Sequence, residues 1–296
     1  PYFDETSRNM GRGSKMKEIS VKKITEAVKK ICIDACCHLP ADVKEAFEKA
    51  KATESSPSGQ EILDQLLENA RIADEEEVAI CQDTGLAVIF SEVGQDIHFV
   101  DGDFEEAIHE GVRQGYVEGY LRKSVVAEPL FERLNTKDNT PAIIHTRIVP
   151  GDQLKLRMGP KGAGSENKSA VKMMVPAAGI EGVKKFVVET VKNAGASACP
   201  PMVIGVGIGG TMEMAALCSK KAAVRDMATV NPDPRYAKLE EELLELINQT
   251  GIGPQGLGGN TTGVKVHIEW YPTHIASLPV AVNINCHAAR HSEVLL

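Results

Sequence analysis

Three cysteines stand in loop-like settings rich in Gly, Pro and small polar residues, and their spacing restricts the folds open to this chain. They are Cys81, Cys199 and Cys286, separated by 118 and 87 residues. Each adjoins a plausible β-strand, so only the tertiary fold could bring them together. Zinc fingers and CxxC sites take their ligands in close pairs, unlike this arrangement. Three thiolates suit an iron-sulfur cluster with one iron left open to bind an oxygen-bearing substrate as a Lewis acid.

The other four cysteines favour packing over ligation. Cys32, Cys36 and Cys37 lie in an amphipathic helical pattern, and Cys218 lies in a second helical segment. The total of seven is odd, and no export signal is evident. We therefore expect reduced thiols or metal ligation and no disulfide framework.

Charge and hydropathy exclude several classes of function. The chain has 33 basic and 41 acidic residues, a net charge of -8, and no block of Lys and Arg. Nucleic acid and anionic membranes are therefore not expected as partners. No apolar run reaches the roughly 18 residues of a membrane span. We expect a soluble, cytoplasmic protein that acts on a small molecule.

Helical and strand-like patterns alternate irregularly along the chain. Helices are predicted at 17–39, 41–51, 59–73, 103–123, 181–193, 211–223 and 236–249. Strands are predicted at 78–80, 86–90, 142–148, 153–157, 202–206, 264–269 and 278–283, with 142–148 and 153–157 paired across a Pro-Gly-Asp turn. We predict a mixed α and β (α+β) fold, with helices packed around a small mixed sheet and glycine-rich loops at 159–164 and 251–263 forming the cluster site.

The first residues differ in character from the rest. The chain begins with Pro1 instead of an initiator Met, and residues 1–15 contain Gly11-Arg12-Gly13-Ser14, which is typical of an expression-tag remnant. The domain of interest is therefore predicted to span 16–296.

Three weaker motifs suggest other chemistry. The segment 205–210 fits GxGxxG between a strand and a helix, but the following residues are too polar and Pro-broken for the second strand of a dinucleotide fold. A tight strand-to-helix turn explains these glycines better. Ser165 and Lys168 match SxxK without the accompanying motifs of serine acyl-enzymes. His287 and His291 lack the Glu that a zinc protease motif needs between them.

The residues after Cys81 are better suited to catalysis. Gln82, Asp83 and Thr84 place an amide, a carboxyl and a hydroxyl beside the thiolate. In a metal-assisted addition or loss of water, a metal can hold the hydroxyl group while a nearby carboxyl moves protons. Asp83 is therefore the candidate catalytic residue.

Five motifs in order resemble one known family over 16–296. They are Cys81-Gln82-Asp83-Thr84-Gly85, Lys161-Gly162-Ala163-Gly164-Ser165-Glu166-Asn167, Ala198-Cys199-Pro200-Pro201 with the glycines of 205–210, the glycine-rich 251–259, and Asn285-Cys286-His287-Ala288-Ala289-Arg290. Together they resemble the alpha subunit of the iron-sulfur-dependent class I fumarate hydratases and the related tartrate dehydratases.

The resemblance implies a cofactor and a set of site residues. Cys81, Cys199 and Cys286 would hold a 4Fe-4S cluster with one open iron. The substrate-binding residues would be Gln82, Asp83, Arg122, Gly164 through its backbone, and His274 as a carboxylate-binding histidine. Asp83 would also take part in proton transfer. A dicarboxylate needs such cationic or donor groups in an acidic protein.

The resemblance also implies a reaction and partners. Residues 161–167 resemble the fumarase branch more closely than the tartrate branch, so reversible hydration of fumarate to L-malate is expected, with L-tartrate dehydration as the alternative. Single-chain relatives carry a further region that completes the pocket, so a separate fumarate hydratase beta subunit is expected, together with pairing of two alpha subunits. Alternatives of another class are an NAD-binding oxidoreductase built on the 205–210 glycines and a non-catalytic iron-sulfur scaffold.

Overall fold

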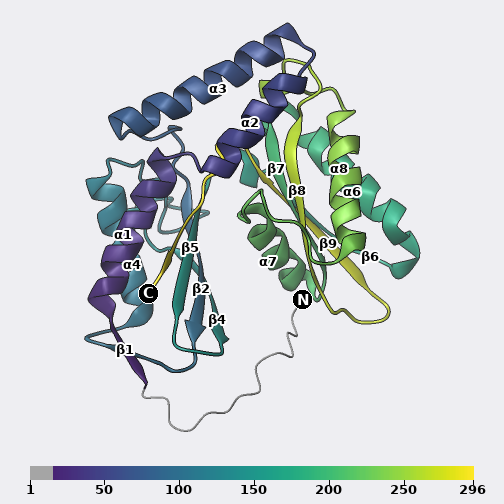
Figure 1. The fold of residues 1–296 in the computed structure, drawn as a ribbon. Coiled ribbons are helices and arrows are strands. Elements are labelled where there is room, and N and C mark those ends of the chain that lie inside the picture. The colour runs from purple at the N-terminus through teal and green to yellow at the C-terminus, as the bar shows by residue number, and fades with distance from the viewer. Residues whose placement is uncertain (1–15) are drawn as a thin grey trace. The chain divides into compact units, whose positions relative to one another are not determined.

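The computed structural model describes residues 16–296, drawn in Figure 1. The predicted tag remnant at 1–15 lies outside the described residues. Two compact units divide the described chain. The first contains 16–40, 72–161 and 290–296, and the second contains 41–71 and 162–289.

The first unit is built on a four-stranded mixed sheet of order β10-β5-β2-β4. Strand β2 pairs with β4 in parallel and with β5 in antiparallel, and β10 closes the other edge of β5. A short parallel pair, β1 with β3, accompanies the sheet. The elements are β1 (Lys17–Ser20), α1 (Val21–Cys37), β2 (Leu86–Gly94), β3 (Ile97–Val100), α4 (Phe104–Glu118), β4 (Ile143–Val149), β5 (Leu154–Lys161) and β10 (Ser292–Leu295).

Helices α1 and α4 pack against each other beside this sheet (Figure 1). Helix α1 begins at Ser20, whose side chain accepts a hydrogen bond from the amide of Lys22 at 3.4 Å, and α4 begins at Asp103, which caps the amide of Glu106 at 2.9 Å. The apolar face of α1 and the inward side chains of the sheet form one core that also contains the fully buried Tyr116. The core therefore fixes both helices against the strands that carry the Cys81 loop.

The second unit contains a four-stranded mixed sheet of order β6-β9-β7-β8. Strand β7 pairs in parallel with β8 and in antiparallel with β9, which in turn pairs with β6. The elements are α2 (Ala41–Thr53), α3 (Pro57–Glu76, divided by the unit boundary), α5 (Ala163–Glu166), β6 (Ala170–Met174), η1 (Pro176–Ala178), α6 (Gly179–Ala194), η2 (Gly195–Ala198), β7 (Met202–Gly209), α7 (Met212–Ala223), α8 (Pro234–Asn248), η3 (Pro254–Gly256), β8 (Gly263–Tyr271) and β9 (Leu278–Asn285).

Helices cover both faces of the second sheet, α7 on one side and α6 with α8 on the other (Figure 1). The side of α7 is unusually close, because Gly205 and Gly207 lie inside strand β7. A Cβ atom on Gly207 would stand 1.9 Å from the carbonyl oxygen of Ala215 in α7. These glycines therefore serve helix-to-strand packing within a strand that runs to Gly209. The prediction that they form a strand-to-helix turn is wrong for Gly205 and Gly207.

Other local predictions also need correction. Residues 78–80 form no strand; the Ile80 amide donates instead to the carbonyl of Cys36 at 3.0 Å. Strands β4 and β5 do not pair with each other, because β2 lies between them and bonds to both. Helix α4 ends at Glu118, so Arg122 lies in the irregular segment that follows.

The predicted fold class is confirmed, since helices and mixed sheets make up the described chain. There are two four-stranded sheets where one small sheet was expected. Across residues 16–296, none of the helices has the length and apolar character needed to cross a bilayer.

Candidate functional site

In the first unit, the loop 81–85 joins helix α3 to strand β2, and buried donors hold its backbone. Three consecutive carbonyl oxygens each accept a hydrogen bond from a side chain distant in sequence. Arg290 Nη2 donates to the oxygen of Asp83 at 2.8 Å, Tyr116 Oη to Thr84 at 2.7 Å, and Asn139 Nδ2 to Gly85 at 3.0 Å. The main chain beside Cys81 is therefore fixed from several directions.

The predicted substrate contacts of the first unit gather at this loop. Gln82 is exposed, and the carboxylate of Asp83 accepts a hydrogen bond from the amide of Gly85 at 3.0 Å. Thr84 Oγ1 donates to the carbonyl oxygen of Arg122 at 3.1 Å, and the Arg122 residue is exposed. The first unit thus brings Arg122 to the Cys81 loop, although the two are far apart in sequence.

In the second unit, Cys199 adopts an unusual backbone conformation. It follows the 3₁₀ turn η2 with φ 50° and ψ 65°, in the left-handed region that favours glycine. Such strain clusters at functional sites, but seven other non-glycine residues of 16–296 also have a positive φ, so this conformation alone does not mark Cys199 as functional.

The second unit also brings Cys199 and Cys286 to the same end of its sheet. Cys286 follows strand β9 directly, and Asn285 pairs with Val203 near the start of β7. His287 fastens the two loops together: its amide donates to the carbonyl oxygen of Cys199 at 3.0 Å, and its Nδ1 lies 3.2 Å from the same oxygen.

The glycine-rich loop 251–259 reinforces this junction through Gln255. The backbone amide and the side-chain Nε2 of Gln255 both donate to the carbonyl oxygen of Pro200, at 2.7 and 2.8 Å. The same Nε2 lies 3.1 Å from Nδ1 of His287. Gln255 itself has φ 53°, so a second strained residue is held where the cysteine loops meet.

Gly164 lies close to the Cys199 loop. A Cβ atom placed on Gly164 would be 3.6 Å from the carbonyl oxygen of Ser197. The helix that carries it, α5, is anchored by Glu166, which pairs with Lys220 and accepts a hydrogen bond from Asn283 Nδ2 at 2.9 Å. Burial lowers the pKa of Lys220, and the charge of Glu166 opposes this shift.

Exposure separates the seven cysteines into the two groups that the sequence suggests. Cys81, Cys199 and Cys286 are partly exposed, whereas Cys32, Cys36, Cys37 and Cys218 are buried. Burial raises the pKa of Cys36 to about 12, with a smaller opposing contribution from the charge of Arg290. A buried thiol of this kind is a packing residue, since the thiolate is the metal ligand.

The donor set fits a three-thiolate site in its chemistry. Cys81 belongs to the first unit, and Cys199 and Cys286 belong to the second. Within 16–296, no single group of three or more His, Cys, Asp or Glu side chains forms a metal site. Three-cysteine ligation therefore stays a prediction, supported by the partial exposure of these thiols and by the junction at His287.

His274 does not join the two cysteines of its own unit. It lies in the turn after β8, whose last residue, Tyr271, pairs with Gly209 at the far end of β7. Cys199 and Cys286 lie at the opposite end. Strand β7 spans 202–209, a length of about 25 Å at the usual rise per residue. His274 is exposed there and lines a cavity of about 330 Å³ that includes Met173, Met212 and Tyr271.

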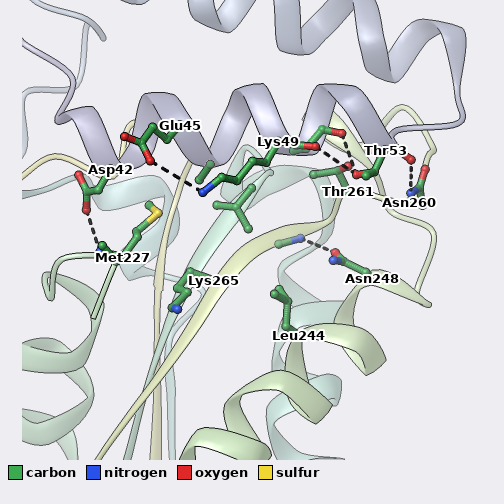
Figure 2. Close-up of a pocket in the computed structure, with 15 residues that line it drawn as sticks. Asp42, Glu45, Lys49, Thr53, Met227, Leu244, Asn248, Asn260, Thr261 and Lys265 are labelled. Atoms are coloured by element: carbon green, nitrogen blue, oxygen red, sulfur yellow. Dashed lines mark hydrogen bonds and ion pairs between the residues drawn. The ribbon is translucent and has the colours of Figure 1, made fainter. Parts of the chain in front are cut away.

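A second cavity of about 430 Å³ lies between α2 and the start of β8 (Figure 2). Two polar contacts join residues that line it: Met227 donates its amide to Asp42 at 2.8 Å, and Lys49 pairs with Glu45 at 3.8 Å. None of its lining residues belongs to a cysteine motif. This cavity is therefore separate from the cysteine loops of the second unit.

Sequence reasoning missed the residues that support the site. Tyr116, Asn139, Gln255 and Arg290 act through hydrogen bonds to loop carbonyls. Gln255 and Arg290 belong to two of the five motifs of the family resemblance, but nothing in their spacing indicates that they support the loops. Tyr116 and Asn139 gave no signal beyond ordinary helix and loop composition.

Comparison with known proteins assigns the chain to a class of enzyme. A family model described as "Fumarate hydratase (Fumerase)" matches residues 25–295. The chain shares 43% identity over 274 residues with "Putative L(+)-tartrate dehydratase subunit alpha" of Methanocaldococcus jannaschii, covering 91% of this chain and 96% of that protein. It shares 33% identity over 284 residues with "L(+)-tartrate dehydratase subunit alpha" of Escherichia coli (strain K12), covering 95% and 93%.

These matches define a hydro-lyase of the alpha-subunit type. The chain belongs to the fumarate hydratase family, in which the tartrate dehydratase alpha subunits are its relatives. The predicted membership of this family is thereby confirmed.

Proposed function

We propose that this chain is the alpha subunit of a fumarate hydratase, which adds water reversibly to fumarate to give L-malate. The observation that carries the cluster site is the junction of the Cys199 and Cys286 loops at His287. The choice of fumarate rests on the resemblance of residues 161–167 to the fumarase branch. Together with Cys81, these thiolates would hold a 4Fe-4S cluster. Such a cluster, when bound, supplies a Lewis acid for the substrate's oxygen atoms.

The remaining chemistry falls to side chains of the chain itself. Asp83 carries a carboxylate beside Cys81 and would hold or move a proton at its oxygen atoms. Gln82 and Arg122 are exposed near the same loop and would orient a carboxylate through N–H donors. The backbone of Gly164 would offer a further donor beside the Cys199 loop.

We also propose that two alpha subunits pair, and the position of His274 supports this. Within one chain, this histidine and the two cysteines of its unit lie at opposite ends of β7. If His274 binds a substrate carboxylate, a second copy must provide it to the cysteine site. The proposed homodimer is therefore a requirement of the site.

A beta subunit would complete the pocket. The relatives from M. jannaschii and E. coli are both named alpha subunits. A chain of this type would supply the cluster and part of the anion site, while its partner would supply the general base for the substrate carbon. Dehydration of L-tartrate is the second candidate reaction, favoured by the names of these relatives.

One preparation can test both reactions. The chain would be co-expressed with its beta subunit, purified anaerobically, and assayed with fumarate, L-malate and L(+)-tartrate. Faster turnover of fumarate and malate would support the proposal, and faster turnover of tartrate would replace it with the second candidate. Iron-loaded protein that turns over none of them would favour the non-catalytic scaffold, and tight NADH binding would favour the oxidoreductase.

A further inference from the structure

The guanidinium of Arg290 is a buried charge in an unusual position. The residue is 3% exposed in the first unit, and only Nη2 has a hydrogen-bond partner, the carbonyl oxygen of Asp83 at 2.8 Å. Among residues 16–296, Nε and Nη1 are buried with no hydrogen-bond partner. Burying a charge whose donors are not all satisfied costs free energy, so a compensating interaction is expected.

Uncharged side chains donate the hydrogen bonds that hold the two carbonyl oxygens after that of Asp83. Tyr116 holds the carbonyl oxygen of Thr84, and Asn139 holds that of Gly85. A neutral amide at position 290 could hold the oxygen of Asp83 in the same way. The positive charge therefore needs a reason other than fixing the loop.

The other buried side chains at this position are poor anions. Cys36 contacts the carbonyl oxygen of Thr84 at 3.9 Å, and burial keeps both Cys36 and Tyr116 protonated by raising the pKa of each. Two anions can compensate the guanidinium. One is the carboxylate of Asp83, whose charge acts on Cys36 together with that of Arg290. The other is the thiolate of Cys81, two residues from Asp83 in the same loop.

We propose that Arg290 is a positioning residue that holds the Cys81 loop through the Asp83 carbonyl and places a permanent positive charge against the anionic iron-sulfur thiolates carried by that loop. This inference rests on the proposed function. Net charge and hydrogen bonding around an iron-sulfur cluster set its reduction potential. A nearby guanidinium favours addition of an electron, so its removal lowers the potential.

The test uses the full chain with its beta subunit, reconstituted anaerobically with iron and sulfide. Arg290→Gln keeps an N–H donor and removes the charge, whereas Arg290→Lys keeps the charge and removes the planar fork. We expect Arg290→Gln to shift the reduction potential to more negative values in a redox titration followed by EPR, and Arg290→Lys to stay near the unmodified protein. The matched control is Arg157→Gln, which removes a guanidinium paired with Glu293 in the same unit and leaves the potential unchanged.

Hydrogen exchange in the metal-free chain tests positioning separately. We expect Arg290→Ala, which removes the donor to the Asp83 carbonyl oxygen, to speed amide exchange in a peptide covering 80–86 by about tenfold, as for loss of one hydrogen bond, and to leave exchange around 199–201 unchanged. Arg290→Gln keeps an N–H donor, so its exchange over 80–86 should stay slower than that of Arg290→Ala. This readout stays decisive if the unmodified protein binds no iron, an outcome that would sink the proposed function itself.

Equal potentials for Arg290→Gln and the unmodified protein would overturn the charge compensation. Unchanged exchange over 80–86 would overturn the positioning role. If Arg290→Gln does not fold, Arg290→Met removes the charge in its place, and a potential equal to that of the unmodified protein would overturn the charge compensation.

Discussion

The backbone amide of His287 donates to the carbonyl oxygen of Cys199 at 3.0 Å, and its ring Nδ1 lies 3.2 Å from the same oxygen. This double contact joins the loops of Cys199 and Cys286, which are 87 residues apart in the sequence. Strands β7 and β9 create it by pairing in antiparallel, which places the start of one beside the end of the other. The second unit thus contributes a preformed pair of cysteine loops.

Two glycines of the second unit should respond to the same substitution with opposite signs. Gly207→Ala would drive a methyl group to 1.9 Å from the Ala215 carbonyl oxygen, so we expect a loss of at least about 1–3 kcal/mol in the free energy of unfolding. Gly164→Ala meets only an ordinary contact at 3.6 Å, and alanine in helix α5 should stabilise by about 0.5–1 kcal/mol.

For Gly164→Ala, the expected effect on substrate binding is opposite to the expected effect on stability. The methyl group of Gly164→Ala would stand at a predicted substrate contact, so KM for the dicarboxylate should rise in a protein that is folded and stable. Urea titrations and steady-state kinetics on both variants check the pair. A Gly164→Ala enzyme with unaltered KM would remove Gly164 from the site.

Gln255 offers a test of strain held for function. Gln255→Gly loses two side-chain contacts worth about 1 kcal/mol each but relieves a left-handed backbone that costs roughly 1–2 kcal/mol in a non-glycine residue. The free energy of unfolding should therefore change by less than about 1 kcal/mol. Gln255→Ala keeps the strain and loses the contacts, so it should be the less stable variant.

Both Gln255 variants should weaken iron retention after anaerobic gel filtration, because His287 loses its contact with Nε2 of Gln255 and the carbonyl oxygen of Pro200 loses one of its two donors from that residue. A Gln255→Gly protein that is as stable as the unmodified chain and retains all its iron would show that the strain serves another purpose.

Much of this organisation can be predicted from sequence, and the reasons for the failures are physical. Helical periodicity identified α1 because it buries one apolar stripe, although residues 17–20 of the predicted helix 17–39 form strand β1 instead. The prediction that β4 pairs with β5 was wrong. The turn at 150–152 has the composition of a hairpin turn, but β2 lies between the two strands and pairs with both. Strand order depends on tertiary packing, which local pattern does not encode.

The candidate site divides in the same way. Cys199 and Cys286 were identifiable because their loops have distinctive composition, and the fold does bring them to one end of a sheet. Arg290, Tyr116 and Gln255 were not, since a donor to a backbone carbonyl can be any polar side chain at any distance in sequence. Their roles became visible only from the hydrogen bonds.

The buried thiol of Cys36 makes stability depend on pH above neutrality. Burial raises its pKa from 9.0 to about 12 in the folded chain, so the folded state keeps the proton that the unfolded chain loses. The contribution is fully present below pH 9 and is lost as the pH rises toward 12, at up to about 1.4 kcal/mol per pH unit.

Cys36→Ala should reduce this dependence and leave the part due to Cys32 and Cys37, because burial raises the pKa of those thiols as well. The control Val28→Ala opens space in the same core and removes no ionisable group, so its loss of stability should be constant with pH. The measurement is the free energy of unfolding in urea for the unmodified chain, Cys36→Ala and Val28→Ala at about pH 8, 9 and 10. These values lie within about one unit of the ordinary thiol pKa. Parallel curves for Cys36→Ala and the unmodified chain would contradict a neutral buried thiol.

The position of His274 predicts complementation between copies. Co-expression of a His274→Ala chain with a Cys199→Ser chain should form mixed dimers in which one of the two sites has both an intact histidine and intact cysteines. Each variant alone should be nearly inactive. Recovery of activity in mixed dimers, purified through two different tags, would show that the histidine acts across the dimer. Mixed dimers as inactive as their parents would place His274 outside the site or within one chain.

The central claim is that Cys81, Cys199 and Cys286 hold one cluster whose open iron binds the substrate. The measurement is the iron and sulfide content, with the EPR spectrum before and after L-malate, of the anaerobic complex with the beta subunit. We predict about four irons per alpha subunit and a spectrum that changes with malate, loss of iron in each Cys→Ser variant at these positions, and full retention in Cys218→Ala, a buried cysteine of α7. Unchanged iron content in all three Cys→Ser variants would contradict the account.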